Sequence, residues 1–421
     1  MNLRGKRLLL LGGTHNIADI RRYADDNGIT LIASGNKPDH PLCRAAEEYY
    51  PADVRDVAAL SALVREHNIH GIFAGGNEDI IPTVIQVCER TGLTFYASQE
   101  QWDITGNKRR FKDACRAAGV PVVPEYTLTD PTSREQLNAI RYPVVIKPID
   151  GSGSRGVYLC HNEAELLAAY PEALKASRSQ TLMVERFMTG FVIVFYITAI
   201  NGEYHVASMC DKYTEPGRPM ATVPQLHLYP SRHLRDCLDR YYPALCGMLR
   251  SLHIQNGVVG IQGFCEDGDI TFTEMGYRLG GTSQQNFTKY LYNYSNMELL
   301  INHALTGRMT DEPCRENPFF PKECATLALI STGGTVARIE GLDIVRAMPG
   351  VICVENHYEP GDTILPADNL SILHFRVFLA AEDLPALKAL VLAVQRTLHV
   401  YDAGGNSLLR EDFDADRIGL Q

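Results

Sequence analysis

The segment YPVVIKPIDGSGSRG, residues 142–156, joins a short apolar run to a glycine-rich loop. Residues 144–146 have the composition of a buried strand, and Lys147 closes this run in front of a proline. The loop at 150–156 carries three glycines and two serines. Glycines let a backbone approach a ligand, and N–H groups beside a lysine suit a polyphosphate. The same segment also fits an ordinary hairpin with a glycine-rich turn.

The composition is that of a globular protein, with 421 residues, 45% hydrophobic residues and a net charge of -10. The length predicts two to four domains. An acidic chain argues against nucleic acid as the main partner. The apolar run at 8–11 is too short for an export signal, and no stretch has the length of a membrane helix. Eleven cysteines without zinc spacing favour reduced thiols in a cytoplasmic protein.

Residues 1–100 alternate strand and helix patterns. We expect strands within 6–13, 29–34, 69–74 and 93–97, and helices at 17–27, 53–68 and 80–91. This alternation predicts a Rossmann-like parallel sheet covered by helices. Small ligands bind at the carboxyl ends of such strands, which here are the turns 12–16 and 75–79. Glu78 and Asp79 in the second turn could recognise an amine, or they could simply interact with the dipole at a helix N-terminus. The motif GGTHNI is not GxGxxG, so a nicotinamide site is not expected.

The remainder of the chain divides at a proline-rich stretch, residues 311–322. We predict a middle domain at 101–312, with a flap lobe at about 112–186, and a C-terminal α+β domain at 313–421. Within the middle domain, four cations among residues 108–112 suggest a solvated helix face, although one of them could share an anion with Lys147. Residues 211–231 resemble a loop over a site, and residues 234–252 one helix.

A second polar group lies on a predicted hairpin near residue 270. Gln262 and Glu274 are equidistant from the turn at Gly268, so they are expected side by side on one face. A carboxylate and a neutral oxygen can hold Mg²⁺ when phosphates supply its other ligands. Arg278 follows and suits a phosphate or an oxyanion. The alternative is a plain ion pair between Glu274 and Arg278.

Four motifs occur in a meaningful order: Asn107-Lys108 before AGVPVVP, then VVIKPIDGSGSRGV, MVERFMTG and GIQGF…FTEMGYRLGG. Together they resemble the ATP-grasp superfamily over about residues 100–310. The resemblance is to its carboxylate–amine ligases, and also to biotin carboxylase and the carbamoyl phosphate synthetase large chain. The C-terminal unit is similar to that of the L-amino-acid ligases. The resemblance implies an N-terminal α/β domain, an ATP-grasp core and a C-terminal α+β domain.

The resemblance also implies roles for individual residues. Lys108 and Lys147 would contact ATP phosphates, and Lys212 would approach the γ-phosphate. The residues implied in the mobile flap are Gly151, Ser152, Gly153 and Gly156. The residues implied at the adenine are Glu185 and the Phe187 backbone. Gln262 and Glu274 would bind Mg²⁺, and Arg278 would contact the transferred phosphate and the acyl intermediate.

Two positions depart from the family pattern. Val192 stands where a ribose-binding glutamate is usual, and Gly276 stands where an asparagine metal ligand is usual.

The leading hypothesis from the resemblance is an ATP- and Mg²⁺-dependent ligase that joins a small-molecule carboxylate to an amine through an acylphosphate. The alternatives are a nucleotide-binding protein with weakened catalysis and a purine-biosynthesis-like or bicarbonate-activating enzyme. No nucleic acid or membrane partner is expected, and a homodimer is an open alternative.

Overall fold

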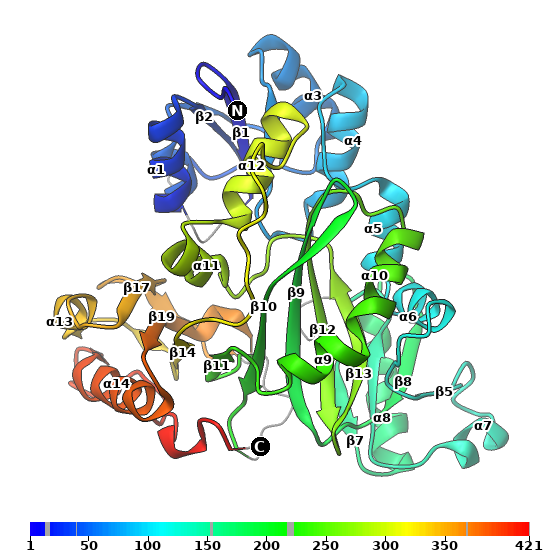
Figure 1. The fold of residues 1–421 in the computed structure, drawn as a ribbon. Helices are drawn as coiled ribbons and strands as arrows, with labels where there is room; N and C mark the ends of the chain where they lie inside the picture. Colours follow the sequence, from blue (N-terminus) through cyan, green and yellow to red (C-terminus); the bar gives the residue numbers. More distant parts are fainter. Residues whose placement is uncertain (13–16, 39, 152–154, 217–222, 368, 421) are drawn as a thin grey trace.

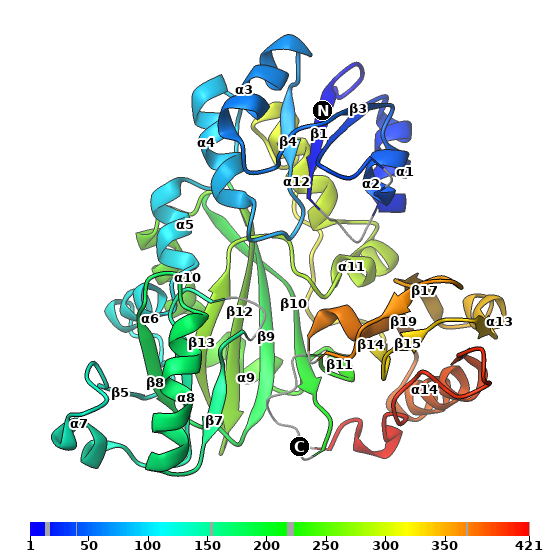
Figure 2. The ribbon, with the colours of Figure 1, turned by 180° about the vertical axis from the view of Figure 1, so that it is seen from behind.

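The computed structural model describes residues 1–12, 17–38, 40–151, 155–216, 223–367 and 369–420. Figure 1 shows the N-terminal sheet in blue above a long green antiparallel sheet, with the C-terminal unit in orange and red beside that sheet. The reverse view in Figure 2 places the small sheet that carries β6 and β8 on the opposite side from the C-terminal unit. The α/β and α+β fold class predicted from the sequence is confirmed.

The N-terminal unit is a parallel sheet with strand order β3-β2-β1-β4. Its elements are β1 (Arg7–Leu11), α1 (Ile17–Asn27), β2 (Thr30–Ser34), α2 (Pro41–Ala45), β3 (Glu48–Tyr50), α3 (Val57–Glu66), β4 (Gly71–Phe73) and α4 (Ile81–Thr91). Successive leucines of β1 enter opposite cores, because side chains alternate along a strand. Gly71 allows close packing, since a Cβ there would lie 2.4 Å from the carbonyl oxygen of Ala304.

The strand predicted at residues 93–97 is wrong. The backbone of this segment is engaged elsewhere, because the Leu93 amide donates to Cys88 O and Tyr96 O accepts from the Tyr277 hydroxyl at 2.8 Å. The segment is therefore a connection between α4 and α5, and in the described chain β4 is an edge of the parallel sheet.

A small antiparallel sheet with the order β5-β8-β6-β7 follows. Its region contains α5 (Gln99–Thr105), α6 (Lys108–Ala117), β5 (Glu125–Tyr126), α7 (Arg134–Ala139), β6 (Val144–Pro148), β7 (Tyr158–Cys160), α8 (Glu163–Lys175) and β8 (Leu182–Arg186). All five residues of β6 are buried. The β6–β7 pairing and the helix capped by Asn162 confirm the predicted hairpin and its following helix.

The central sheet has the strand order β13-β12-β9-β10-β11-β14-β19-β17 and is antiparallel throughout. These strands are β9 (Phe191–Ile200), β10 (Glu203–Tyr213), β11 (Leu226–Tyr229), β12 (Gly257–Glu266), β13 (Asp269–Gly276), β14 (Glu323–Ile330), β17 (Val351–Asn356) and β19 (Leu373–Ala381). The sheet continues across the proline-rich stretch that marks the predicted boundary at 312/313.

The helices around this sheet are α9 (Leu234–Arg240), α10 (Tyr242–Ser251), α11 (Gln285–Tyr292), α12 (Asn296–Thr306), α13 (Leu342–Arg346) and α14 (Leu384–Thr397). The short elements are β15 (Gly334–Thr335), β16 (Arg338–Glu340), β18 (Thr363–Ile364), β20 (His399–Tyr401) and the 3₁₀ turns Leu370–Ile372 and Ala415–Arg417. Helix α12 packs against the N-terminal sheet, and their side chains share one apolar core.

Two further predictions in this region are corrected. The single helix expected at 234–252 is two helices that meet at Tyr241, because Pro243 lacks an N–H and fits the first turn of a new helix. The loop expected at 211–231 contains the end of β10 and all of β11. Strand β11 was obscured by the surrounding prolines, and it connects the middle of the chain to β14.

Candidate active site

A cleft with a volume of about 930 Å³ lies where the small sheet, the central sheet and the C-terminal unit meet. Its lining includes Lys147 from β6, Glu185 from β8, Glu274 from β13 and Arg376 from β19. We call the part around Lys108, Lys147 and Glu185 the lysine end. The part around Arg278, His227 and Arg376 is the arginine end.

Gln262 and Glu274 are direct cross-strand partners on β12 and β13, as predicted from their distances to the turn. Glu274 faces Lys108, with 3.3 Å between its Oε2 and the lysine Nζ. Gln262 Oε1 accepts a hydrogen bond of 2.8 Å from Lys212 Nζ. Two strands of the central sheet thus present one carboxylate and one amide to the lysines of the cleft.

The charge of Glu274 is set by these lysines. Burial acts to raise its pKa, but the charges of Lys108, Lys147 and Lys212 outweigh burial and bring the pKa down to about 2. Glu274 is therefore an anion at every physiological pH. Three cations converging on one carboxylate leave an excess of positive charge, which favours a polyanionic ligand.

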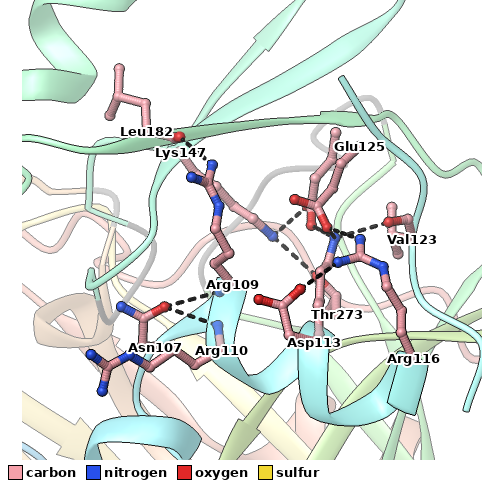
Figure 3. Close-up of polar contacts among 12 residues, drawn as sticks. Asn107, Arg109, Arg110, Asp113, Arg116, Val123, Glu125, Lys147, Leu182 and Thr273 are labelled. Atoms are coloured by element: carbon pink, nitrogen blue, oxygen red, sulfur yellow. Dashed lines mark hydrogen bonds and ion pairs between the residues drawn. The ribbon is translucent and has the colours of Figure 1, made fainter. Parts of the chain in front are cut away.

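Lys147 lies in a buried charge network (Figure 3). Its Nζ is 2.5 Å from Glu185 Oε2 and donates to Thr273 Oγ1 at 3.0 Å. The other carboxylate oxygen of Glu185 pairs with Lys112, which also donates to Val123 O at 2.9 Å. Glu185 is thus shared by two lysines, one that faces the cleft and one that lies behind it.

Lys112 was expected on a solvated helix face, and this interpretation is wrong, because its side chain is fully buried. Burial lowers the pKa of Lys112, while the charge of Glu185 opposes this shift. The position carried a usable signal. Lys112 lies next to Phe111 and three residues before Cys115, on the face of α6 that helical periodicity assigns to the core.

The glycine loop after β6 lies beside Lys108, as predicted from the sequence. Gly151 O accepts a hydrogen bond of 2.7 Å from Lys108 Nζ. Gly156 has a φ of +72°, and a Cβ there would lie 2.5 Å from Ala176 Cβ, so only glycine fits. Ser152 and Gly153, which the resemblance implies in the flap, lie outside the described residues.

Phe187 lines the same cleft as Glu185, as expected for residues near a base. Its backbone N–H, however, donates to Pro143 O at 3.1 Å. This hydrogen bond competes with an adenine contact through the Phe187 amide. The adenine roles of Glu185 and Phe187 remain predictions.

Arg278 marks the arginine end and is held by the N-terminal unit. Its Nε donates to Glu78 Oε1 at 2.8 Å, and its Nη2 lies 2.6 Å from the same oxygen. The partner of Arg278 is therefore Glu78, 200 residues away, and Glu274 instead faces Lys108. Gly76 permits this approach, because a Cβ there would lie 2.8 Å from Leu279 O. Asp79 pairs with Arg178 at 2.8 Å.

Three buried side chains line the arginine end: Tyr196, His227 and, from the C-terminal unit, Arg376. The Tyr196 hydroxyl lies 2.8 Å from Thr282 Oγ1, and Arg376 Nη1 donates to Glu355 Oε2 at 3.1 Å. His227 is buried between charges: burial lowers its pKa well below the usual range, and Lys212 and Arg376 add to the effect. The sequence interpretation assigned the C-terminal unit no chemistry and missed Arg376.

The two departures from the family pattern both line the cleft. Val192 faces the cleft from β9 as the cross-strand partner of Lys212 and Phe264. A Cβ at Gly276 would lie 3.5 Å from Arg278 Cζ, an ordinary contact distance. A side chain at position 276 would therefore fit beside Arg278.

The donor set suits a metal only together with a ligand. In the part of the chain that the structure describes, no three His, Cys, Asp or Glu side chains form a group able to hold a metal ion. Gln262 and Glu274 supply two oxygen donors, which fits Mg²⁺ carried by phosphates, because this ion keeps few protein ligands. None of the described helices combines the length and apolar composition needed to cross a bilayer.

Two family models match parts of the chain. The ATP-binding domain of the carbamoyl-phosphate synthase L chain matches residues 107–199, and the L-amino acid ligase C-terminal domain 2 matches residues 327–401. Among curated proteins, dapdiamide A synthase of Enterobacter agglomerans is 24% identical, over 83% of this chain and 84% of its own length.

Two solved structures show the same fold over nearly the whole chain. An L-amino acid ligase from Bacillus licheniformis aligns with a TM-score of 0.77 and 19% identity, over 94% of this chain and 98% of that one. The biotin carboxylase domain of 2-oxoglutarate carboxylase from Hydrogenobacter thermophilus, a dimer crystallised with MgADP and bicarbonate, aligns with a TM-score of 0.76 and 20% identity, over 96% and 91%. The chain thus has the ATP-grasp fold, and two of its segments are similar to family models from carbamoyl-phosphate synthase and the L-amino acid ligases.

Proposed function

We propose that this protein is an ATP-dependent ligase that activates a small-molecule carboxylate as an acylphosphate and joins it to an amine, releasing ADP and phosphate. The observation that carries the proposal is the convergence of Lys108, Lys147 and Lys212 on Glu274 in one large cleft. An excess of ammonium groups around one carboxylate and one amide fits a triphosphate with its metal ion. The L-amino acid ligase and dapdiamide A synthase supply the analogy for the reaction type.

Magnesium would be held by Gln262 and Glu274, the two oxygen donors that β12 and β13 bring together. When bound, such an ion neutralises charge on the phosphates. The matched biotin carboxylase structure contains MgADP, which supports the choice of ion.

The remaining roles come from the resemblance and are supported by the positions of the lysines in the cleft. Lys108 and Lys147 bind phosphate oxygens. Gly151 and Gly156 let the backbone of the glycine loop stay close to the ligand. Lys212 is placed to neutralise the γ-phosphate, because it reaches Gln262 from β10. The resemblance alone places Glu185 and Phe187 at the base. The flap role of Ser152 and Gly153 rests on the resemblance alone.

Arg278 neutralises the developing charge of the reaction. The substrate carboxylate attacks the γ-phosphorus, the bond to ADP breaks, and the amine then displaces phosphate and loses a proton. Each step places negative charge on oxygens near Arg278, whose guanidinium is held in place by Glu78. Preorganised cations of this kind lower the barrier without forming a covalent bond to the substrate.

The test measures ADP formation with a panel of carboxylates, first with amines and then with hydroxylamine. Hydroxylamine captures an acylphosphate as a hydroxamate, so its product reports activation even when the natural amine is unknown. We expect ADP and hydroxamate in equal amounts, both dependent on Mg²⁺. ADP formation with none of the acids, or ADP formation without hydroxamate, would contradict the ligase proposal.

A second candidate, a nucleotide-binding protein with weakened catalysis, is favoured by Val192 and Gly276. It predicts ATP binding in calorimetry without turnover. Labelled bicarbonate incorporated in place of an organic acid would instead support the bicarbonate-activating alternative. A cytoplasmic location and a homodimer stay predictions, and light scattering of the purified protein tests the latter.

A further inference from the structure

The arginine end contains a row of polar residues of which the proposed chemistry uses only the first, Lys212. Lys212 pairs across strands with His227, and His227 pairs with Thr326. Arg376 pairs with Glu355 on the next two strands and is diagonal to Thr326. Because paired residues lie on one face of a sheet, these side chains form a continuous line, which we call the polar row.

The polar row faces the cleft. His227, Thr326 and Arg376 all line it, and their exposed fractions are only 6%, 1% and 7%. Three polar side chains, each more than nine-tenths buried, therefore lie along the wall of the cleft in which the reaction is proposed. The row begins at Lys212, which reaches Gln262, so it runs directly from the lysine end into the C-terminal unit.

Three atoms of the polar row are buried without a hydrogen-bond partner among the described residues: His227 Nε2, Thr326 Oγ1 and Oε1 of Glu355, the carboxylate that holds Arg376. A buried polar atom left unpaired loses the hydrogen bonds that water would give it, which is unfavourable. Such a cost beside a cavity indicates that a ligand supplies the partner. A ligand that accepts hydrogen bonds would satisfy the threonine hydroxyl and the arginine N–H groups together.

Glu355 orients Arg376 but does not occupy all of its hydrogen-bond donors. Glu355 holds it through a single contact of 3.1 Å to Nη1, and a guanidinium presents five donors in a planar fork. The arrangement repeats that of Arg278, which Glu78 holds through one carboxylate oxygen. Tyr196 lines the cleft together with both arginines, and the charges of both oppose the rise that burial causes in the pKa of its hydroxyl.

We propose that Arg376, with Thr326 and His227, forms a subsite for a second substrate carboxylate, one that does not react. This deepens the proposed function and rests on it: Arg278 serves the carboxylate that is activated, and Arg376 holds another carboxylate of the reacting pair. The group belongs either to a dicarboxylic acid or to an amine substrate that is itself an acid. A planar carboxylate matches the fork of Arg376, and the uncharged amide of the same shape does not.

The experiment compares each acid with its amide. One arm uses hydroxylamine as the amine and compares succinate with succinamate as the acid. The other arm keeps one acid that the enzyme accepts and compares alanine with alaninamide as the amine. In the arm that holds the subsite ligand, we expect kcat/KM for the acid to exceed that for the amide by about 10- to 100-fold, the effect of one charged hydrogen bond.

Removing Arg376 alone would leave Glu355 as a buried carboxylate without its cation, so Arg376→Gln is combined with Glu355→Gln. We expect the double variant to lose the preference for the acid while its kcat/KM for the amide stays within about 3-fold of wild type. Arg338→Gln is the matched control, because Arg338 is an exposed arginine of the same unit that pairs with Glu340. The control should keep the preference in full.

Calorimetry makes the result independent of turnover. Succinate and alanine are titrated into the wild type and the double variant in the presence of a non-hydrolysable ATP analogue and Mg²⁺. Loss of binding of one of them in the double variant supports the subsite even if ligase activity fails. An unchanged acid preference in both arms, or equal binding of both probes to both proteins, would overturn it. Hydroxamate formation with an intact acid preference in the double variant overturns the subsite alone.

Discussion

The two ends of the cleft solve the problem of buried charge in opposite ways. At the lysine end, every lysine has a carboxylate partner, because Lys147 and Lys112 share Glu185 and Lys108 faces Glu274. At the arginine end, His227 Nε2 and Thr326 Oγ1 have no hydrogen-bond partner in the described chain, although Arg278 and Arg376 each have a glutamate. The lysine end thus pairs its cations within the protein but keeps an excess of positive charge, whereas the arginine end leaves buried polar atoms without a partner.

This difference explains why Glu185 has two lysines. In the proposed function Lys147 turns toward a phosphate, and Glu185 would then keep Lys112 instead of being left as an isolated buried anion. Breaking a buried ion pair by removing one partner costs about 3–5 kcal/mol. A second lysine avoids most of that cost and makes the movement of Lys147 accessible. The following changes test the comparison between the two ends.

The largest effect is expected for Lys147→Ala, which removes the cation of the lysine end that faces the ligand. Turnover of ATP should fall at least about 10³-fold, because a preorganised charge on the phosphates is lost. The fold should persist, since Lys112 still neutralises Glu185. Steady-state ADP formation measures the first effect and thermal unfolding the second. Normal turnover in this variant would remove Lys147 from the reaction.

Arg278→Gln breaks the arginine end at its reacting group. We expect kcat to fall about 10²-fold with little change in the KM for ATP, because Arg278 acts on developing charge and the nucleotide is held at the lysine end. Glu78 loses its partner, so Glu78→Gln/Arg278→Gln is the companion variant that keeps the site neutral. A rise in the KM for ATP without a change in kcat would place Arg278 in nucleotide binding instead.

Lys112→Met tests whether the hidden lysine serves Lys147. With Glu185 left to Lys147 alone, we expect the KM for ATP to rise about 10-fold, and the melting temperature to fall because one partner of a buried pair is removed. The control is Arg110→Met, a change on the exposed side of the same helix. Adding Glu185→Gln to Lys112→Met should restore part of the ATP affinity. A stability loss without a change in KM would assign Lys112 a purely structural role.

The smallest effect is expected for Gly276→Asn, which restores the usual family residue between the two ends. Position 276 has room for a Cβ at an ordinary distance from Arg278. An added amide oxygen should lower the Mg²⁺ concentration needed for half-maximal ADP formation by about 3- to 10-fold, the worth of one neutral ligand contact. Gly281→Asn is a control of the same size, because Gly281 lines the cleft and has open space at its Cβ. Equal responses of the two variants would exclude a specific role for position 276.

The local sequence pattern predicted the structure correctly where interactions within a single element or hairpin determine it. The apolar run before Lys147 is β6, the helix at 17–27 is α1, and the spacing of Gln262 and Glu274 around Gly268 places them in register. These predictions rest on alternation, capping and turn chemistry, which act within a few residues. Pattern failed at residues 93–97, where a tyrosine 181 residues away takes the backbone carbonyl that a strand would need.

The candidate site shows the same division. The lysine loop, the Gln262/Glu274 hairpin and Arg278 can be identified from the sequence, because each is a local motif. Three other features become visible only in the folded chain: Glu78 holds Arg278, Lys112 lies buried behind Glu185, and Arg376 reaches the cleft. Each of these contacts joins residues of separate elements. The free energy of a buried charge depends on which partners surround it in space, and the order of residues along the chain does not fix those partners.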